Sequence, residues 1–275
     1  MRLRSGVLVL LVALVAACAD APATERTLTL GTAQGDRTAL VHHPATAGPG
    51  APLVLVLHGA AGTATGMRAL TGWDELAERE GVVVAYPQGL DRTWNAGTCC
   101  GSSAARGIDD VGYLHDLAAA LTAREGTDPR RVYAVGFSNG AMLSYAWACG
   151  RPGDLAGIGP VAGALTVPCP APGPVRVAAV AGTADPRVPI GGRPGRASLD
   201  ATLAPFLAAA SCTAPTTAVT APAIVTRWTC AGGRTVAQNV LAGRDHSWAA
   251  PAAGAGTTSD PGDATGWVWA QLSAP

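Results

Sequence analysis

Short runs of apolar residues alternate with longer segments of mixed polarity along most of the chain. Residues 53–57, 82–86, 157–161 and 175–181 are mainly aliphatic. A strand that is buried on both faces of a parallel sheet has this pattern, because helices cover it above and below. Five other segments have the length and the spacing of apolar residues that are typical of helices, at 67–80, 109–124, 139–149, 199–210 and 266–272.

Further strands are predicted at 27–30, 38–42, 131–135, 224–229 and 235–241. Strands that alternate with helices favour a mostly parallel sheet with helices on both faces. The chain has 275 residues, of which 48% are hydrophobic, and this is enough for one substantial core. We therefore predict a single domain of the α/β class.

The charge composition excludes several classes of function. Lys+Arg number 19 and balance the 19 Asp+Glu, so the chain lacks the cationic excess of a nucleic-acid-binding protein. All the basic side chains are arginine, and the sequence contains no lysine. Schiff-base chemistry, a Ser-Lys dyad and a GxxxxGK[ST] phosphate-binding loop all need a lysine, so all three are excluded.

The N-terminus has the features of an export signal. Arg2 and Arg4 precede an apolar run at residues 7–15, which is too short for a transmembrane helix. Small residues then lead directly to Cys18, as in bacterial lipoproteins, although an ordinary secretory signal with an incidental cysteine is the alternative. We predict a signal peptide at 1–17, lipidation of Cys18, a tether at 18–25 and the catalytic domain at 26–275. The protein would then be extracytoplasmic, either anchored to the cell membrane by this lipid or secreted.

Six further cysteines agree with an oxidising compartment. Their even number predicts disulfides. The easiest pair is Cys212 with Cys230, which flank one short segment, and the other four would pair among themselves. The adjacent Cys99 and Cys100 lack the CxxC spacing with which two thiolates reach one zinc ion, so we predict no metal site. The six residues are Cys99, Cys100, Cys149, Cys169, Cys212 and Cys230.

The segment Gly136–Gly140 reads GFSNG and fits the motif GxSxG. The motif alone is weak, but here it lies between the strand predicted at 131–135 and the helix predicted at 139–149. A strand–turn–helix setting exposes the serine at the edge of the sheet and places a helix N-terminus beside it. These features predict Ser138 as a nucleophile.

The order of residues along the chain identifies the partners of this serine. In proteins with a GxSxG turn of this kind, the nucleophile precedes the acid, and the acid precedes the histidine. His246 is the only histidine after Ser138, which makes it the predicted base. Asp185 directly follows the strand predicted at 175–181, and we predict it as the acid that orients the histidine. Asp200 is a distant second candidate. Asp154 comes too early, and Asp245 adjoins the histidine itself.

Two backbone N–H groups should stabilise the negative oxygen that forms in the reaction. One is expected from Asn139, the residue after the nucleophile, and the other from the loop after the strand at 53–57. Ala60 is our choice in that loop, with Gly59 as the alternative. His58 is expected to position the loop rather than to act in catalysis.

Several short motifs run in order along the chain from about residue 50 to residue 250. They are Leu57-His58-Gly59, Tyr86-Pro87-Gln88-Gly89, Trp94-Asn95-Ala96-Gly97 with Cys99-Cys100, Asp109-Asp110-Val111-Gly112, Asp128-Pro129 through Gly140, Pro160-Val161-Ala162-Gly163, Gly182-Thr183-Ala184-Asp185 and His246-Ser247-Trp248. Together these motifs resemble the family of secreted polyhydroxybutyrate depolymerases and feruloyl or acetylxylan esterases, often lipoprotein esterases. The resemblance implies an α/β-hydrolase fold, the triad Ser138, Asp185 and His246, ester substrates and no cofactor.

The resemblance also leaves differences in the expected substrate pocket. Arg244-Asp245 stands before the histidine where the family commonly has glycines, and Ala249 stands where it has a proline. Trp94 and Trp248 are candidate pocket walls, although buried tryptophans often belong to the core.

The function expected from these motifs is a monomeric serine carboxylic ester hydrolase. Its substrates would be small or oligomeric esters, such as feruloyl or acetyl esters or hydroxybutyrate oligomers. No nucleic acid is expected as a partner, and membrane contact is expected only through Cys18. A serine peptidase or acyltransferase on the same fold is the alternative, and a non-catalytic binding lipoprotein is the alternative of another class.

Overall fold

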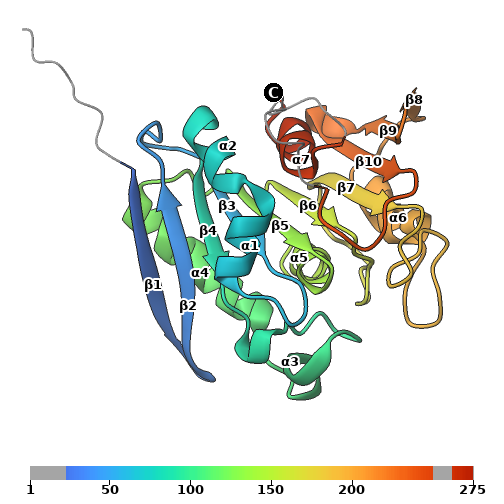
Figure 1. The fold of residues 1–275 in the computed structure, drawn as a ribbon. Helices are drawn as coiled ribbons and strands as arrows, with labels where there is room; N and C mark the ends of the chain where they lie inside the picture. The colour runs from blue at the N-terminus through green and yellow to red at the C-terminus, as the bar shows by residue number, and fades with distance from the viewer. Residues whose placement is uncertain (1–22, 250–261, 275) are drawn as a thin grey trace, which may run out of the picture.

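The computed structural model describes residues 23–249 and 262–274, which form one ten-stranded sheet with helices on both faces (Figure 1). The strands lie in the order β1-β2-β4-β3-β5-β6-β7-β10-β9-β8. Their bounds are β1 Thr24–Thr32, β2 Gly35–His43, β3 Leu53–Leu57, β4 Val83–Pro87, β5 Val132–Phe137, β6 Gly157–Val161, β7 Arg176–Gly182, β8 Thr216–Thr220, β9 Ala223–Thr229 and β10 Thr235–Leu241.

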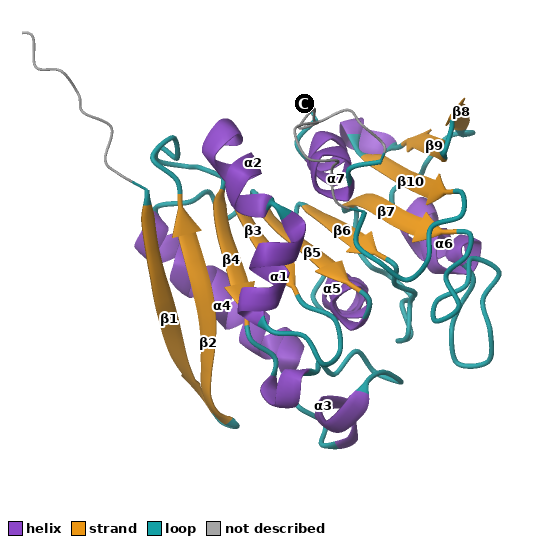
Figure 2. Cartoon of the chain, in the orientation of Figure 1, coloured by secondary structure: helices purple, strands orange, loops and turns teal. Residues whose placement is uncertain are grey.

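Seven α-helices and two short 3-10 turns connect the strands of this part of the chain (Figure 2). The helices are α1 Ala64–Thr71, α2 Trp73–Glu80, α3 Gly101–Ala105, α4 Asp110–Glu125, α5 Asn139–Gly150, α6 Leu199–Ala209 and α7 Ala264–Leu272. The turns are η1 Leu90–Arg92 and η2 Ala231–Gly233.

The centre of the sheet is parallel and its two edges are antiparallel. Six central strands are parallel to one another, in the order β4, β3, β5, β6, β7 and β10. The hairpin of β1 and β2 pairs antiparallel with β4 at one edge, and β9 and β8 follow β10 antiparallel at the other. The predicted class, with a mostly parallel sheet and helices on both faces, is confirmed.

Three local predictions were wrong or incomplete. The single helix predicted at 67–80 is two helices, because Gly72 has φ 66° and ends α1 in a left-handed cap before α2 begins. Strand β8 was not predicted, since the short segment TTAVT has no continuous apolar run, and every residue of it is exposed in the structure. Strand β1 begins at Thr24, so Thr24 and Glu25, which we expected in the tether, pair with β2.

Each face of the sheet has its own apolar core. Residues Leu117, Tyr145 and Phe206 of α4, α5 and α6 pack on one face. Trp73 of α2 and Trp267 of α7 pack on the other face together with residues of α1. Figure 1 shows α1 and α2 in front of the sheet and α4 behind it. Because helices cover both faces, the central strands β3, β4 and β6 are buried at every position.

The parallel direction of β3, β5, β7 and β10 brings the loops that follow these strands to the same edge of the sheet. These loops carry four of the predicted site segments: residues 58–62 after β3, Ser138 after β5, Asp185 after β7 and His246 after β10. In open α/β sheets, ligands bind beyond the carboxyl ends of the strands. The topology therefore places the candidate chemistry at the edge where the fold favours a site.

The disulfides follow the predicted grouping. Cys212 pairs with Cys230 as expected, and the other four pair among themselves. Their pairs are Cys149 with Cys169 and Cys99 with Cys100. The predicted signal peptide and Cys18 lie outside the described residues. Within the described residues, no helix combines the length and the apolar character needed to cross a membrane.

A buried ion pair joins the antiparallel edge of the sheet to the helix layer. The guanidinium of Arg37 on β2 donates to Asp110 Oδ1 at 2.7 Å, and the two side chains are 1% and 0% exposed. Arg37 also lies over the Tyr113 ring, 4.0 Å from its centre. Asp110 Oδ2 accepts the N–H of Asn95 at 2.6 Å. Burial raises the pKa of the Asp110 carboxyl, which the bonds from Asn95 and Arg37 partly offset.

Replacing Arg37 by methionine is expected to lower the free energy of unfolding by about 3–5 kcal/mol, because Asp110 would be left as a buried carboxylate without its cation. Urea denaturation of the folded chain measures this loss. The double variant Arg37→Met/Asp110→Asn should recover part of it, since no charge then remains buried. A loss below about 1 kcal/mol in the single variant would mean that the pair does not hold this edge.

Candidate active site

Ser138 lies in a sharp turn between β5 and α5. Its backbone angles, φ 53° and ψ −112°, are outside the regions that non-glycine residues favour. A Cβ at Gly136 would lie 2.4 Å from the Gly140 carbonyl, and a Cβ at Gly140 would lie 2.3 Å from the Leu57 carbonyl oxygen. Only glycines allow the strand and the helix to approach this closely, so the two glycines of the motif make the turn possible.

Ser138, His246 and Asp185 form one hydrogen-bonded chain. His246 Nε2 lies 2.8 Å from Ser138 Oγ, and His246 Nδ1 lies 2.7 Å from Asp185 Oδ2. Because a carboxylate only accepts hydrogen bonds, Nδ1 carries the proton and Nε2 is free to accept the proton of the serine. The structure thus brings together the three residues that we predicted from chain order.

Backbone groups fix the orientation of the Asp185 carboxylate. Its Oδ1 accepts the N–H groups of Arg187 at 2.8 Å and Val188 at 2.9 Å, which leaves Oδ2 for His246. The residue is 3% exposed. A buried carboxylate that three donors satisfy can hold an imidazole in one tautomer and stabilise it when it becomes charged.

The rival acids have other partners. Asp245 accepts the Ser247 hydroxyl at 2.5 Å, and Asp154 accepts bonds from His115 and the Trp147 ring N–H. Asp200 lies exposed in the first turn of α6. Neither Asp245 nor Asp200 is bonded to His246 in the part of the chain that the structure describes.

The loop after β3 presents a backbone N–H beside Ser138. A Cβ at Gly59 would lie 3.4 Å from the Ser138 Cβ, which shows how close the loop comes. The Gly59 carbonyl accepts two hydrogen bonds, from His58 Nδ1 at 2.8 Å and from the Gly62 N–H at 2.9 Å. The Gly59 carbonyl and the Ala60 N–H belong to one peptide unit and point in opposite directions. Two donors on the carbonyl therefore fix the direction of the Ala60 N–H.

Both predicted oxyanion donors are free of protein acceptors within residues 23–249 and 262–274. The N–H groups of Ala60 and Asn139 take part in no backbone or side-chain hydrogen bond there. Asn139 opens helix α5, where the backbone N–H groups lack intrahelical partners and the helix dipole favours negative charge. The pair has the chemistry of an oxyanion hole, and its role in this chain stays a prediction.

His58 orders this loop as a neutral imidazole. Its Nε2 accepts the Gly89 N–H at 3.0 Å, while Nδ1 donates to the Gly59 carbonyl. Burial lowers the pKa of His58, and the charge of Arg92 adds to the effect. A neutral ring can accept with one nitrogen and donate with the other, which is what both contacts require. The loop-positioning role that we expected for His58 agrees with these contacts.

Comparison with known proteins places the chain among esterases. Residues 37–170 match the family model described as Esterase PHB depolymerase. Over these residues, just under half of the chain, the protein is similar to the esterase PHB depolymerase family. The matched region includes Ser138 and the loop after β3, while Asp185 and His246 lie beyond it.

Two relatives illustrate the range of the family. NocK of Nocardia uniformis subsp. tsuyamanensis, an esterase by name, is 37% identical over 147 residues, which are 52% of this chain and 42% of NocK. Poly(3-hydroxyalkanoate) depolymerase C of Paucimonas lemoignei is 31% identical over 137 residues, which are 48% of this chain and 33% of that protein. The matches thus span less than half the length of these relatives.

Solved structures support the fold. The acetyl xylan esterase from Aspergillus awamori superposes with a TM-score of 0.63 at 15% identity, and the match covers 81% of this chain and 94% of that one. At this identity the likeness concerns the fold alone. The α/β-hydrolase fold expected from the motifs is confirmed.

The two tryptophans expected as pocket walls are core residues, and that prediction was wrong. Trp94 is 0% exposed and Trp248 is 4% exposed. The Trp94 ring N–H donates to the His58 carbonyl at 2.8 Å, and the Trp248 ring N–H donates to Thr265 at 3.2 Å. Sequence alone placed both near the site but could not show that neighbouring side chains cover them.

Trp94 acts on the site through its backbone, which sequence reasoning missed. The side chain of Asn139 accepts the Trp94 N–H at 2.8 Å and donates to the Trp94 carbonyl at 3.0 Å. The next residue, Asn95, is held by Asp110 and thus by the buried Arg37 pair. This connected series of bonds fixes the residue whose N–H we expect to face the oxyanion.

A cleft of about 330 Å³ opens next to the residue that precedes the nucleophile. Phe137, the residue before Ser138, lines this cleft, and the centre of its ring lies 5.0 Å from that of the His246 ring. The loop after β3 forms one wall of the cleft. Its remaining lining comes from residues of α1, with Met67 and Leu70, and from Arg92.

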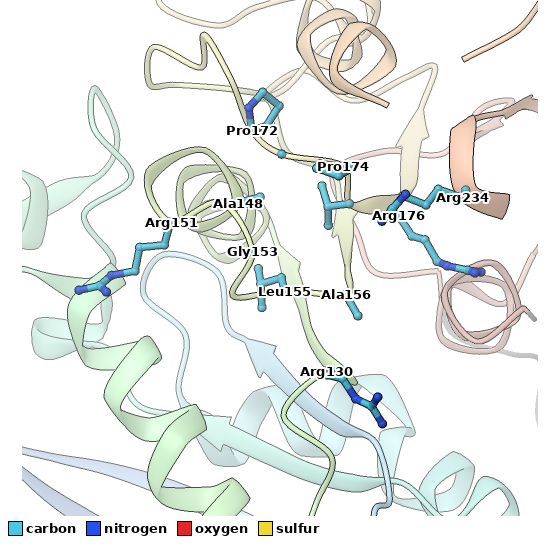
Figure 3. A pocket seen from close by; sticks show the side chains of 13 residues that line it. Arg130, Ala148, Arg151, Gly153, Leu155, Ala156, Pro172, Pro174, Arg176 and Arg234 are labelled. Carbon is cyan, nitrogen blue, oxygen red and sulfur yellow. The ribbon is translucent and has the colours of Figure 1, made fainter. Parts of the chain in front are cut away.

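Two other features of the structure lie away from Ser138. Glu25, His42 and Asp74 could jointly approach a metal ion, but the Arg68 guanidinium already binds both carboxylates. A cavity of about 400 Å³ has four arginines in its lining (Figure 3). Its residues Ala156 and Arg176 lie at the N-terminal ends of β6 and β7, so it is at the edge of the sheet opposite the candidate site.

Proposed function

We propose that this protein is a serine carboxylic ester hydrolase. The observation that carries the proposal is the hydrogen-bonded chain from Ser138 Oγ through His246 to Asp185 Oδ2, at 2.8 Å and 2.7 Å. It lies at the carboxyl edge of an α/β-hydrolase sheet, next to two N–H groups suited to an oxyanion. The match of residues 37–170 to the esterase PHB depolymerase family model supports an ester as the substrate.

In the proposed mechanism, Ser138 Oγ attacks the ester carbonyl carbon while His246 Nε2 takes the hydroxyl proton. The carbonyl oxygen becomes negative, and the N–H groups of Ala60 and Asn139 stabilise it, each by about 3 kcal/mol. His246 then gives its proton to the leaving alcohol, and the acyl group stays on Ser138. Water attacks this acyl-enzyme with His246 as base, which releases the acid and restores the serine.

The substrates we propose are small or polymer-derived esters, namely feruloyl or acetyl esters or hydroxybutyrate oligomers. The names of the relatives support this range, since they include acetylxylan, feruloyl and poly(3-hydroxyalkanoate) enzymes. We also propose that the protein works outside the cytoplasm as a monomer, anchored through Cys18 or secreted. Its three disulfides support an oxidising compartment.

A fluorophosphonate tests the proposed function directly, because it forms a covalent bond only with an activated serine. We expect one label per chain, located on Ser138 by peptide mapping. With p-nitrophenyl acetate, a burst of nitrophenol should precede the steady state if deacylation is slow. A chain that takes no label on Ser138 and hydrolyses no ester would favour the binding-lipoprotein alternative.

A further inference from the structure

One cation lies on the rim of the cleft beside the predicted oxyanion donors. Arg92 is exposed, and its guanidinium donates to the carbonyls of Ala61 and Gly62. In return, the Ala61 N–H donates to the Arg92 carbonyl at 2.8 Å. These contacts hold the Arg92 side chain against the loop that carries Ala60, so its positive charge has a fixed position.

No carboxylate in the described part of the chain pairs with Arg92. The adjacent Asp91 forms an ion pair with Arg106 at 2.8 Å and accepts the Ser102 hydroxyl at 3.1 Å, so its negative charge already has a partner. The charge of Arg92 nevertheless reaches the site, because it contributes to the lowered pKa of His58. The rim of the cleft thus carries a positive charge without a protein counter-ion.

The guanidinium also has hydrogen-bonding capacity to spare. Arginine has five N–H donors, and here Nε and one N–H of Nη2 bind the loop carbonyls. Three donors remain for a ligand. Since a guanidinium binds the two oxygens of a carboxylate in one plane, a carboxylate is the group that best matches this geometry.

The cleft links this cation to the nucleophile. Phe137, residues 58–63 and Arg92 all line it, with Met67 and Leu70 as apolar lining, and within this loop Gly59 lies against Phe137 and Ser138 while Ala61 and Gly62 bind Arg92. Its volume of about 330 Å³ suits one short substrate group rather than a long polymer segment. A substrate whose carbonyl carbon is at Ser138 can therefore extend a short apolar group into the cleft with its far end near Arg92.

Resting on the proposed esterase function, we propose that Arg92 selects esters that carry a free carboxylate a few atoms from the ester bond. Two classes have this chemistry: short oligomers of hydroxy acids that end in a free carboxylate, and monoesters of short dicarboxylic acids. A neutral ester fits the same cleft but gains no ion pair. The charge of Arg92 thus determines preference among substrates, while Ser138 carries out the reaction.

A pair of fluorophosphonates tests this preference through the rate of a single covalent step. The two probes differ only at the end of a short alkyl chain, which bears a carboxylate in one and its methyl ester in the other. In the wild-type chain we expect the carboxylate probe to label Ser138 about five to ten times faster at low salt. Added salt should reduce this ratio, because the rim of the cleft is exposed to solvent.

Arg92→Met is expected to bring the ratio of the two rates to about 1, whatever its effect on the rates themselves. Arg92→Lys should keep part of the ratio, since it keeps the charge but loses the planar donor pair. Arg79→Met, on an exposed arginine of α2, is the matched control and should keep the wild-type ratio. The dimer of 3-hydroxybutyrate and its methyl ester should show the same preference in kcat/KM, and Arg92→Met should remove it mainly by raising the KM of the free dimer.

The results separate this inference from the proposed function. If both probes label Ser138 but the wild-type ratio is 1, or Arg92→Met slows both probes equally, Arg92 only supports the loop and the inference is wrong. If neither probe labels Ser138, the esterase proposal itself fails and the inference fails with it.

Discussion

Ser138→Ala is expected to lower kcat for any ester substrate by about 10⁴-fold or more, because no other group can form the acyl-enzyme. The loss should appear in kcat and in kcat/KM to the same degree, since the serine hydroxyl forms its bond only as the reaction proceeds. Fluorophosphonate labelling should disappear. Steady-state hydrolysis of p-nitrophenyl acetate and mass spectrometry of the labelled chain measure the two effects.

The fold should survive this substitution. Ser138 already occupies its unusual backbone angles, and alanine removes a single oxygen from a partly exposed side chain. The Tm is therefore expected to stay within about 2 °C of the wild type. Ser144→Ala on the same helix is the matched control, because its hydroxyl binds only the Ala141 carbonyl. Normal labelling of Ser138→Ala, or equal losses in both variants, would show that the nucleophile is elsewhere.

The position of the site could be predicted because it depends on chain order and backbone topology. A GxSxG turn must follow a strand and open a helix, and β5 and α5 meet both conditions. Only one histidine follows Ser138, so His246 needed no further evidence. Asp185 was chosen because it directly follows a buried strand, and parallel strands bring such positions to one edge.

What could not be predicted depends on contacts between distant side chains. Trp94 is buried and its ring packs against His58, which is 36 residues earlier in the chain, and no local sequence pattern encodes this contact. The hydrogen bond between the Trp94 N–H and the Asn139 side chain joins residues 45 positions apart. Strand β8 forms because β9 offers it a partner, although all of its own residues are exposed.

Asp185→Asn is expected to lower kcat by about 10⁴-fold while leaving Ser138 in place, because it changes the tautomer of His246. Two backbone N–H groups, those of Arg187 and Val188, bind Oδ1 of residue 185. An amide NH₂ at that position would face two donors, so the asparagine must keep its oxygen there. Its NH₂ then points at His246 Nδ1, which has to accept.

In that state Nε2 of His246 carries the proton and can no longer take one from Ser138. Nitrogen-15 NMR of the imidazole should show the proton on Nε2 in the variant and on Nδ1 in the wild type. Asp245→Asn is the matched control, since Asp245 adjoins His246 but binds Ser247 instead. We expect it to retain activity within about threefold of the wild type. Should Asp245→Asn lose more activity than Asp185→Asn, the acid of the site would be Asp245, and the backbone bonds to Asp185 would serve only the loop after β7.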